Sequence, residues 1–166
     1  MLIKSISGIR GTIGGIPGEA LTPQDLVKFA TGYALWVKED SGKEKPIVII
    51  GRDARMSGSM VSLIVSSTLN SMGVDVIDLG LSTTPTVELV VPKLGADGGI
   101  ILTASHNPKN WNALKLLNSA GEFLSKSAGE KVLEFSEMPN SYSSVDNLGK
   151  TTFEDGWIKW HVAHIL

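Results

Sequence analysis

The residues best suited to chemistry form one short polar segment behind an apolar run. Gly99–Leu102 is apolar, and Ser105, His106 and Asn107 follow it closely. In open α/β sheets, ligands bind where strands end at their carboxyl edge, so a hydroxyl, an imidazole and an amide would meet at a suitable place. A serine hydroxyl is a weak nucleophile until it is activated. The same residue types are common in turns, and on residue types alone the turn is the favoured interpretation.

One lysine is unusual because of its neighbours. Lys115 lies inside the apolar run 114–117, and a buried ammonium is costly unless it is paired. Lys115 is therefore either a functional amine or a lysine on an edge strand that points to water, a common device against sheet aggregation. A hydrolase based on Ser105 is the weakest alternative, because the G-x-S-x-G pattern of hydrolases does not surround this serine.

The elements that must position these residues alternate between strands and helices. Thr22, Pro23 and Asp25 form a capping box with proline at the first helical position, which predicts a helix start. Further strands are expected at 1–6, 47–51, 74–79, 98–102 and 113–117, and further helices begin at Ser57, at Thr84 and at Ser125 or Ser127. The strand from 113 follows its predecessor too closely for a helical crossover. The pattern predicts an α/β domain with a mixed, mostly parallel sheet.

Composition excludes several classes of protein and site. The chain has 166 residues, 42% of them hydrophobic, a net charge of −2 and no cysteine. Disulfides and thiolate metal sites are therefore excluded, and near-neutral charge gives no reason to expect nucleic acid or a membrane as partner. The start of the chain is unlike a signal peptide, and no apolar stretch approaches the ~20 residues that span a bilayer. We expect a cytoplasmic protein.

The domain organisation changes near residue 140. Residues 1–140 carry the alternating pattern and form one expected domain, whereas 138–150 is rich in serine and asparagine and is typical of a linker. Residues 153–166 regain an apolar pattern that predicts a helix with Trp157 and Trp160. We expect 141–166 to be a linker and a helix that lead toward a second domain absent from this sequence.

Three segments together resemble one known family. Thr103–Pro108 resembles the serine signature of the α-D-phosphohexomutases, the family of phosphoglucomutase, phosphomannomutase and phosphoglucosamine mutase. Gly8–Thr12 resembles the arginine loop of that family, and Gly51–Gly58 resembles its glycine-arginine-aspartate segment. The resemblance covers about residues 1–140 and implies a three-layer α/β/α fold, the first of four domains.

The resemblance implies a role for each candidate residue. Ser105 matches the serine that carries the phosphoryl group. Arg10 matches the arginine on the phosphate side, which can clamp two phosphate oxygens, and Lys115 matches the catalytic lysine that moves a proton. His106 and Asn107 match residues that contact phosphate or substrate and hold the loop. Without the resemblance, Arg10 would be interpreted as a solvated arginine.

A metal ion is also implied by the resemblance. Mg²⁺ would bind the phosphate on Ser105, which is the one expected metal ligand of this chain, and three aspartates of the second domain would complete the site. Asp53 is instead expected to orient Arg52 or Arg55, and Asp97 to lie in a turn. Arg52 is expected to anchor the loops of the domain.

Two positions depart from the family pattern. Ser7 stands where many members have an aspartate, which puts in doubt a salt bridge that would orient Arg10. Ala113 stands where many members have a glycine ahead of the lysine, a variation seen in a subgroup.

The implied function is the exchange of a phosphoryl group between the 1- and 6-hydroxyls of a hexose through a bisphosphate intermediate. The partners would be a phosphorylated hexose and the remaining domains of the same polypeptide, and the chain alone would be inactive. Glucose, mannose and glucosamine phosphates all stay open as substrates. The alternative is a non-catalytic phosphate-binding or regulatory module with the same fold.

Overall fold

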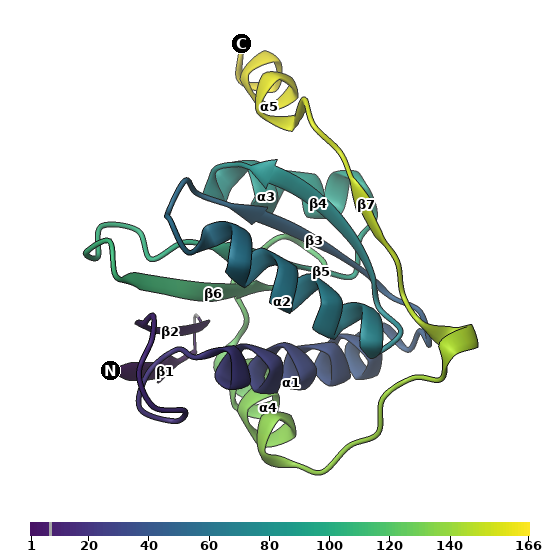
Figure 1. Ribbon diagram of the computed structural model, residues 1–166. Helices are drawn as coiled ribbons and strands as arrows, with labels where there is room; N and C mark the ends of the chain where they lie inside the picture. Colours follow the sequence, from purple (N-terminus) through teal and green to yellow (C-terminus); the bar gives the residue numbers. More distant parts are fainter. Residues whose placement is uncertain (7) are drawn as a thin grey trace.

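The computed structural model describes residues 1–6 and 8–166. It contains one sheet in the order β1-β2-β6-β5-β3-β4-β7 (Figure 1). The strands are β1 (Leu2–Ser5), β2 (Gly8–Thr12), β3 (Ile47–Arg52), β4 (Asp75–Leu81), β5 (Gly98–Leu102), β6 (Trp111–Leu117) and β7 (Thr151–Phe153). The helices are α1 (Pro23–Ser41), α2 (Gly58–Ser71), α3 (Thr84–Lys93), α4 (Lys126–Glu137) and α5 (Trp157–Ile165), with a 3₁₀ turn at Val145–Asn147.

The sheet has a parallel half and an antiparallel half. Strand β3 pairs in parallel with β4 and β5, and β4 pairs in parallel with β7. Strands β1, β2, β6 and β5 form the antiparallel half. The mixed α/β sheet is confirmed, including the antiparallel strand after β5, and its antiparallel share is larger than the helix–strand alternation indicated. The reason is the N-terminal hairpin β1–β2, which adds itself to β6.

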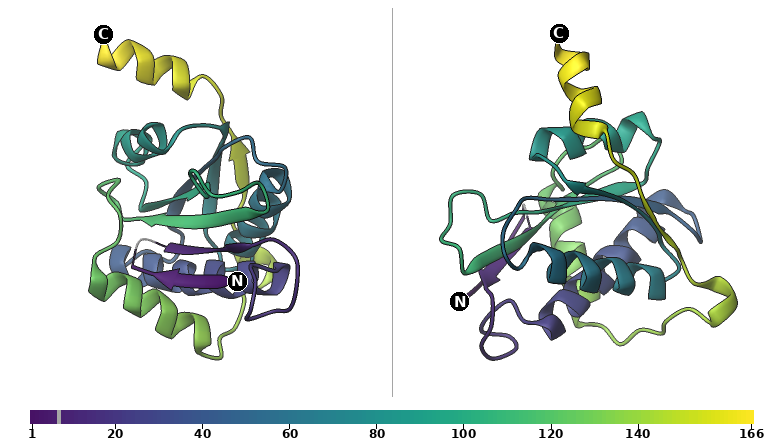
Figure 2. Two further views of the ribbon diagram at one scale, coloured as in Figure 1. Left: turned by 90° about the vertical axis from the view of Figure 1, so that its left-hand side faces the viewer. Right: turned by 45° about the horizontal axis from the view of Figure 1, so that its top comes forward.

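Helices cover both faces of the sheet and make three layers (Figures 1 and 2). Helices α1 and α2 cover one face, and α4 packs on α1. Helix α3 covers the opposite face and contacts α5. Because side chains alternate along a strand, Val48 and Ile50 of β3 enter the core beneath α1 and α2, whereas Ile49 packs with α3. The predicted α/β/α architecture is confirmed.

Local sequence signals explain most of the helix ends. The capping box of Thr22 and Asp25 is present, and Gly42 ends α1 with a φ of 68°, a conformation that glycine adopts freely. Ser125 caps α4. Helix α3 begins at Thr84 as expected, although the residue that caps it is Thr83. Helix α2 follows Ser57 as expected, but Ser57 has helical backbone angles (φ −79°, ψ −9°) and its side chain makes no capping hydrogen bond.

The C-terminal segment returns to the sheet. After α4, residues 138–150 run along the molecule to the far edge, where β7 pairs with β4 (Figure 1). The helix expected from Phe153 was wrong at its start, because Phe153 ends a strand and α5 begins at Trp157. The domain limit at residue 140 stays a prediction. Among the described residues, none of the helices is long and apolar enough to cross a membrane.

Candidate functional site

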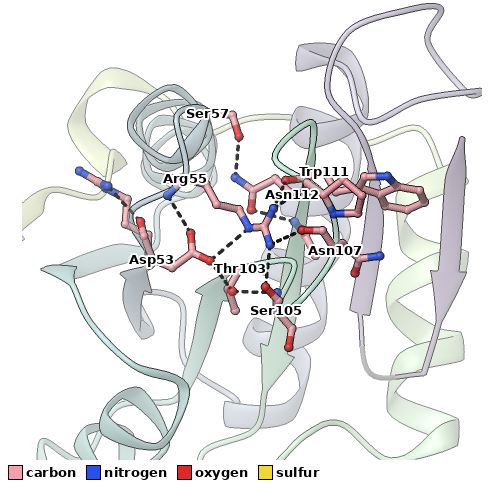
Figure 3. A network of polar contacts seen from close by, with 11 residues as sticks. Asp53, Arg55, Ser57, Thr103, Ser105, Asn107, Trp111 and Asn112 are labelled. Atoms are coloured by element: carbon pink, nitrogen blue, oxygen red, sulfur yellow. Dashed lines mark hydrogen bonds and ion pairs between the residues drawn. The ribbon is translucent and has the colours of Figure 1, made fainter.

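The candidate site lies at the loop 103–110, between the end of β5 and the start of β6 (Figure 3). Strands β5 and β3 are parallel neighbours, so the segment after β3, which carries Asp53 and Arg55, meets this loop at the same edge of the sheet. The main-chain N–H of Asp53 donates to the carbonyl oxygen of Leu102 at 3.2 Å. Two of the three segments that carry the family resemblance are thus in direct contact.

Arg55 is the centre of this contact. Its side chain is 11% exposed, and its Nε donates to Asp53 Oδ2 at 3.2 Å. Its two terminal nitrogens donate to four main-chain carbonyl oxygens in the loop and at the start of β6: those of Ser105 at 2.7 Å, Pro108 at 2.8 Å, Asn107 at 2.9 Å and Trp111 at 3.1 Å. A guanidinium has five N–H groups, so every donor of Arg55 has an acceptor inside the protein.

Asp53 and Thr103 connect Arg55 to the serine. Asp53 Oδ2 accepts a hydrogen bond from Thr103 Oγ1 at 2.6 Å, and Asp53 Oδ1 accepts one from the main-chain N–H of Arg55 at 3.1 Å. Thr103 Oγ1 in turn accepts from the N–H of Ser105 at 3.0 Å. Of the two arginines proposed for Asp53, Arg55 is the one that its carboxylate holds. Arg52 donates to the carbonyl oxygen of Asp53 at 3.2 Å and not to its carboxylate.

A second connection fixes the far end of the loop. The side chain of Asn112 is fully buried and donates from Nδ2 to Ser57 Oγ at 2.9 Å, while its Oδ1 accepts from the N–H of Ala113. This pair joins the first turn of α2 to the start of β6 (Figure 3).

Ser105 has an unusual backbone. Its φ is 55°, and it is the one non-glycine residue with positive φ in the described part of the chain. A residue with a side chain in this region costs on the order of 1–3 kcal/mol, so its surroundings must hold it. Thr103 holds its N–H and Arg55 holds its carbonyl oxygen. The residue itself is exposed, so its side chain can be reached from solvent.

His106 and Asn107 differ in how they take part. His106 is exposed, and its ring has no hydrogen bond or ion pair with any described residue. Asn107 is half-buried, its N–H donates to the carbonyl oxygen of Ala104 at 3.0 Å, and its own carbonyl oxygen accepts from Arg55. The main chain of Asn107 thus helps to hold the loop, while the ring of His106 is exposed and takes no part in holding it.

Lys115 and Arg10 lie on one face of the sheet. In the β2–β6 register, Gly8 is opposite Lys115 and Arg10 is opposite Ala113, and directly opposed residues share a face. Ile101 is opposite Lys115 on the other side and belongs to the core beneath α3. Both cations are therefore on the α3 side. The alternative of an edge-strand lysine is wrong, because β6 lies between β2 and β5.

A carboxylate of α3 is close enough to respond to this lysine. Partial burial raises the pKa of Glu88, and the positive charge of Lys115 opposes that rise. Lys115 is half-buried and Arg10 is exposed. Arg10 makes no side-chain hydrogen bond or ion pair with the described residues. The expected lack of a salt bridge between position 7 and Arg10 concerns Ser7, which lies outside the described residues.

Asp97 lies at the end of the sheet opposite to the candidate site, where strands β3 and β5 begin. It precedes β5, and its carboxylate accepts from Lys43 Nζ at 2.8 Å and from the N–H of Ile47 at 2.9 Å. It therefore ties the amino ends of two strands together. Arg55, the residue that sequence reasoning left without a role, is the main organiser of the site. Its only signal was its spacing of two residues from Asp53 in the glycine-arginine-aspartate segment.

Comparisons with known proteins agree on the family. A family model described as the alpha/beta/alpha domain I of phosphoglucomutase/phosphomannomutase matches residues 2–142. A phosphoglucomutase/phosphomannomutase from Thermococcus kodakarensis is 42% identical over 118 residues, which are 70% of this chain and 26% of that protein. A phosphoglucosamine mutase from Leuconostoc citreum is 35% identical over 157 residues, which are 90% of this chain and 34% of that protein.

A solved structure supports the fold. The parafusin (phosphoglucomutase) structure from Paramecium, in its open form, has a TM-score of 0.77 and 18% identity over 98% of this chain and 34% of that one. The chain thus spans about a quarter to a third of the length of the relatives that it matches. It belongs to the phosphohexomutase family and corresponds to domain I of that family.

Proposed function

We propose that Ser105 carries the phosphoryl group in a phosphosugar mutase that interconverts hexose 1-phosphate and hexose 6-phosphate. The observation that carries the proposal is the contrast within the loop: the main chain of Ser105 is held at both its N–H and its carbonyl, while the residue is exposed. A nucleophile or carrier must be held in position and still reach its substrate. The family membership of the chain supports the same conclusion.

The reaction would proceed by two transfers. In the first, a sugar hydroxyl oxygen forms a bond to phosphorus, the bond between phosphorus and Ser105 Oγ breaks, and the serine oxygen takes up a proton. The product is a hexose bisphosphate. In the second transfer, Ser105 Oγ loses its proton and forms a bond to the phosphorus of the other phosphate. The bond between that phosphorus and the sugar oxygen breaks, and the sugar oxygen takes up a proton, which releases the isomeric monophosphate. A covalent carrier thus divides one difficult exchange into two in-line steps.

Lys115 and Arg10 are the proposed catalytic residues beside Ser105. Lys115 would take part in moving the proton that leaves the attacking sugar hydroxyl. The exposed guanidinium of Arg10 would stabilise the charge on the transferring phosphoryl group. His106 and Asn107 are proposed to contact phosphate or substrate oxygens. The free cations on the α3 side of the sheet support these assignments, since none of their donors is satisfied by the described residues.

A magnesium ion is proposed to bind the phosphate on Ser105. The loop of this chain offers one ligand, the phosphate itself, because the Asp53 carboxylate already accepts three hydrogen bonds. Among the described residues, no three histidine, cysteine or acidic side chains form a group that could hold a metal. Further ligands would come from outside the chain. When bound, Mg²⁺ would neutralise charge on the phosphoryl oxygens.

The remaining domains of a longer polypeptide are the proposed partners of this one. The matched stretches make up only 26% and 34% of the two relatives. We propose that residues 1–140 are domain I, that 141–166 lead toward a second domain, and that the chain alone has no mutase activity. A cytoplasmic location is part of the same proposal, as for an enzyme that acts on phosphorylated sugars.

The test replaces Ser105 by alanine in the full-length protein. Conversion of glucose 1-phosphate should fall to background, and intact mass after incubation with glucose 1,6-bisphosphate should show one added phosphate in the wild type and none in Ser105→Ala. The matched control is Ser119→Ala, an exposed serine away from the loop. Wild-type turnover in Ser105→Ala would rule out the carrier role. A protein that binds the bisphosphate and never becomes phosphorylated would favour the regulatory module.

A further inference from the structure

All five N–H donors of the Arg55 side chain are engaged by the protein, which points to a role that the family resemblance did not include. We infer that Arg55 is a positioning residue for phosphoryl transfer, which holds Ser105 in its left-handed conformation and does not bind the phosphate itself. The inference rests on the proposed function of Ser105. It assigns different roles to two arginines, Arg10 and Arg55.

Arg55 has no donor to offer a phosphate. All five of its N–H groups are used by the protein, and its side chain is 11% exposed. A phosphate could bind it only by displacing carbonyl oxygens of the loop. Each displaced carbonyl in this partly buried place would lose a charge-assisted hydrogen bond. Arg10 is the opposite case, because its guanidinium is exposed and has no acceptor within the described residues.

The four carbonyl oxygens explain why a cation is needed here. They belong to Ser105, Asn107, Pro108 and Trp111, so they come from both sides of one tight loop. Each carbonyl oxygen carries partial negative charge, and a phosphoserine adds about −1.5 to −2 at neutral pH. The guanidinium draws the four oxygens inward and offsets their charge. Without it, these four carbonyl oxygens would lose their hydrogen bonds and repel one another.

Asp53 and Thr103 make the position specific. Arg55 is held at its Nε and main-chain N–H by Asp53, and Thr103 bridges Asp53 to the N–H of Ser105. The two sides of the Ser105 backbone are thus tied to one carboxylate, through Thr103 on one side and Arg55 on the other. This closed arrangement can hold Ser105 at a φ of 55°, a conformation that a non-glycine residue otherwise avoids.

The first experiment changes Arg55 to lysine in the full-length protein. Lysine keeps the charge but has three donors and no planar fork, so it cannot serve five acceptors. Misplacement of a reacting group by about 1 Å costs on the order of 100-fold in rate. We expect kcat with glucose 1-phosphate to fall about 100-fold and KM to change less than about 3-fold, since Arg55 does not touch the sugar phosphate.

Two control variants distinguish a loss of activity caused by misplacement of Ser105 from one caused by lower stability. Arg52→Lys alters the neighbouring arginine, whose one side-chain hydrogen bond goes to the Asp53 carbonyl, and should keep kcat within about 3-fold of the wild type. Tyr33→Phe lowers stability from a buried place outside the loop and should keep kcat at temperatures where it stays folded. An Arg55→Lys protein with wild-type kcat, or with kcat and KM altered only as in Tyr33→Phe, would overturn the inference.

The second experiment removes the guanidinium and returns it from solution. In Arg55→Ala, added guanidinium ion at millimolar concentration should restore part of kcat in a saturable manner, while the Arg10→Ala and wild-type proteins serve as references for non-specific effects. A folded Arg55→Ala protein with no recovery would contradict the positioning role. Intact mass of the wild type keeps the two ideas apart, because a wild type that never takes up phosphate on Ser105 refutes the proposed function and not the geometry of Arg55.

Discussion

The loop 103–110 and the strand pair β2–β6 lie next to each other, but they differ in whether their charged side chains have partners within the protein. In the loop, the guanidinium of Arg55 and the carboxylate of Asp53 are fully engaged by other residues of the domain. On β2 and β6, Arg10 and Lys115 present cations that no described side chain neutralises by a hydrogen bond or ion pair. Groups that position a site must be satisfied within the protein, whereas groups that act on a ligand must be left unsatisfied until it binds.

This difference has an energetic meaning. A satisfied buried ion is costly to remove, because its partners lose their hydrogen bonds. A cation that makes no hydrogen bond or ion pair has no partner to lose, so its removal costs little stability. Changes in the loop should therefore affect folding and catalysis together, and changes on β2 and β6 should affect catalysis alone.

The largest effect is expected for Lys115. Lys115→Gln removes the amine that is proposed to take part in moving the proton, and general acid–base catalysis contributes about 10²–10⁴-fold, so kcat of the full-length protein should fall on the order of 1,000-fold. The melting temperature should stay within about 2 °C of the wild type, because the amine has no hydrogen-bond partner to lose. Lys45→Gln, at an exposed lysine at the opposite edge of the sheet, is the control. Full activity of Lys115→Gln would remove the lysine from the mechanism.

Arg10 is expected to give the next effect. Arg10→Gln takes away charge at the transferring phosphoryl group, and the loss of one such donor costs about 10²–10³-fold. Turnover should fall on the order of 100-fold with an unchanged melting temperature, measured beside the Arg55→Lys protein. Should Arg10→Gln unfold at a clearly lower temperature, the guanidinium would have a structural partner and the contrast with Arg55 would fail.

Tyr33 tests the stability side of the comparison. Its hydroxyl is buried and lies 2.6 Å from the carbonyl oxygen of Leu117 and 3.0 Å from that of Gly99, while the N–H of Gly99 donates to it at 2.9 Å. Burial raises the pKa of this phenol far above its usual value, so it stays a donor at any ordinary pH. Tyr33→Phe should lower the free energy of unfolding by about 2 kcal/mol in urea titrations. The kcat of the folded variant should match the wild type, and a large loss of kcat would show that the loop depends on distant parts of the β5–β6 pair.

Glu88 is expected to give the smallest effect, and it depends on pH. Partial burial raises its pKa, with Lys115 opposing the rise, so the folded protein binds this proton more tightly than the unfolded chain. Its contribution to stability is therefore present below the ordinary glutamate pKa of about 4.3 and is lost as pH rises through the folded value. Glu88→Gln cannot ionise, so its melting temperature relative to the wild type should rise between about pH 4 and pH 7. Glu122→Gln, at an exposed site, should show no such trend.

The layers of the fold were predictable because they depend on local patterns. The capping box at Thr22 and the apolar run of β3 each fix their element from a few neighbouring residues. Strand β7 was missed because Thr151–Phe153 is too short to carry a pattern, and its strand conformation depends on pairing with β4, some 75 residues earlier. The hydroxyl of Ser57 was misassigned for a similar reason, since its partner Asn112 is 55 residues away.

The site was predictable in part for the same physical reason. Motif and spacing singled out Ser105 and Lys115, whose catalytic roles stay a prediction; the structure shows that the first is exposed and the second half-buried. The role of Arg55 could not be predicted, because its four carbonyl acceptors lie 50 to 56 residues further along the chain. A guanidinium in a sequence shows that five donors exist and does not show which acceptors meet them.

The short strand β7 has a consequence for handling this domain in solution. It covers the edge of β4, which would otherwise present unpaired N–H and carbonyl groups to any other strand. A version shortened to residues 1–140 would keep the loop of Ser105 and lose this cover. Such a protein is expected to self-associate edge to edge at high concentration, so solubility, and not phosphate chemistry, would be the first property to suffer from cutting the chain at the predicted domain limit.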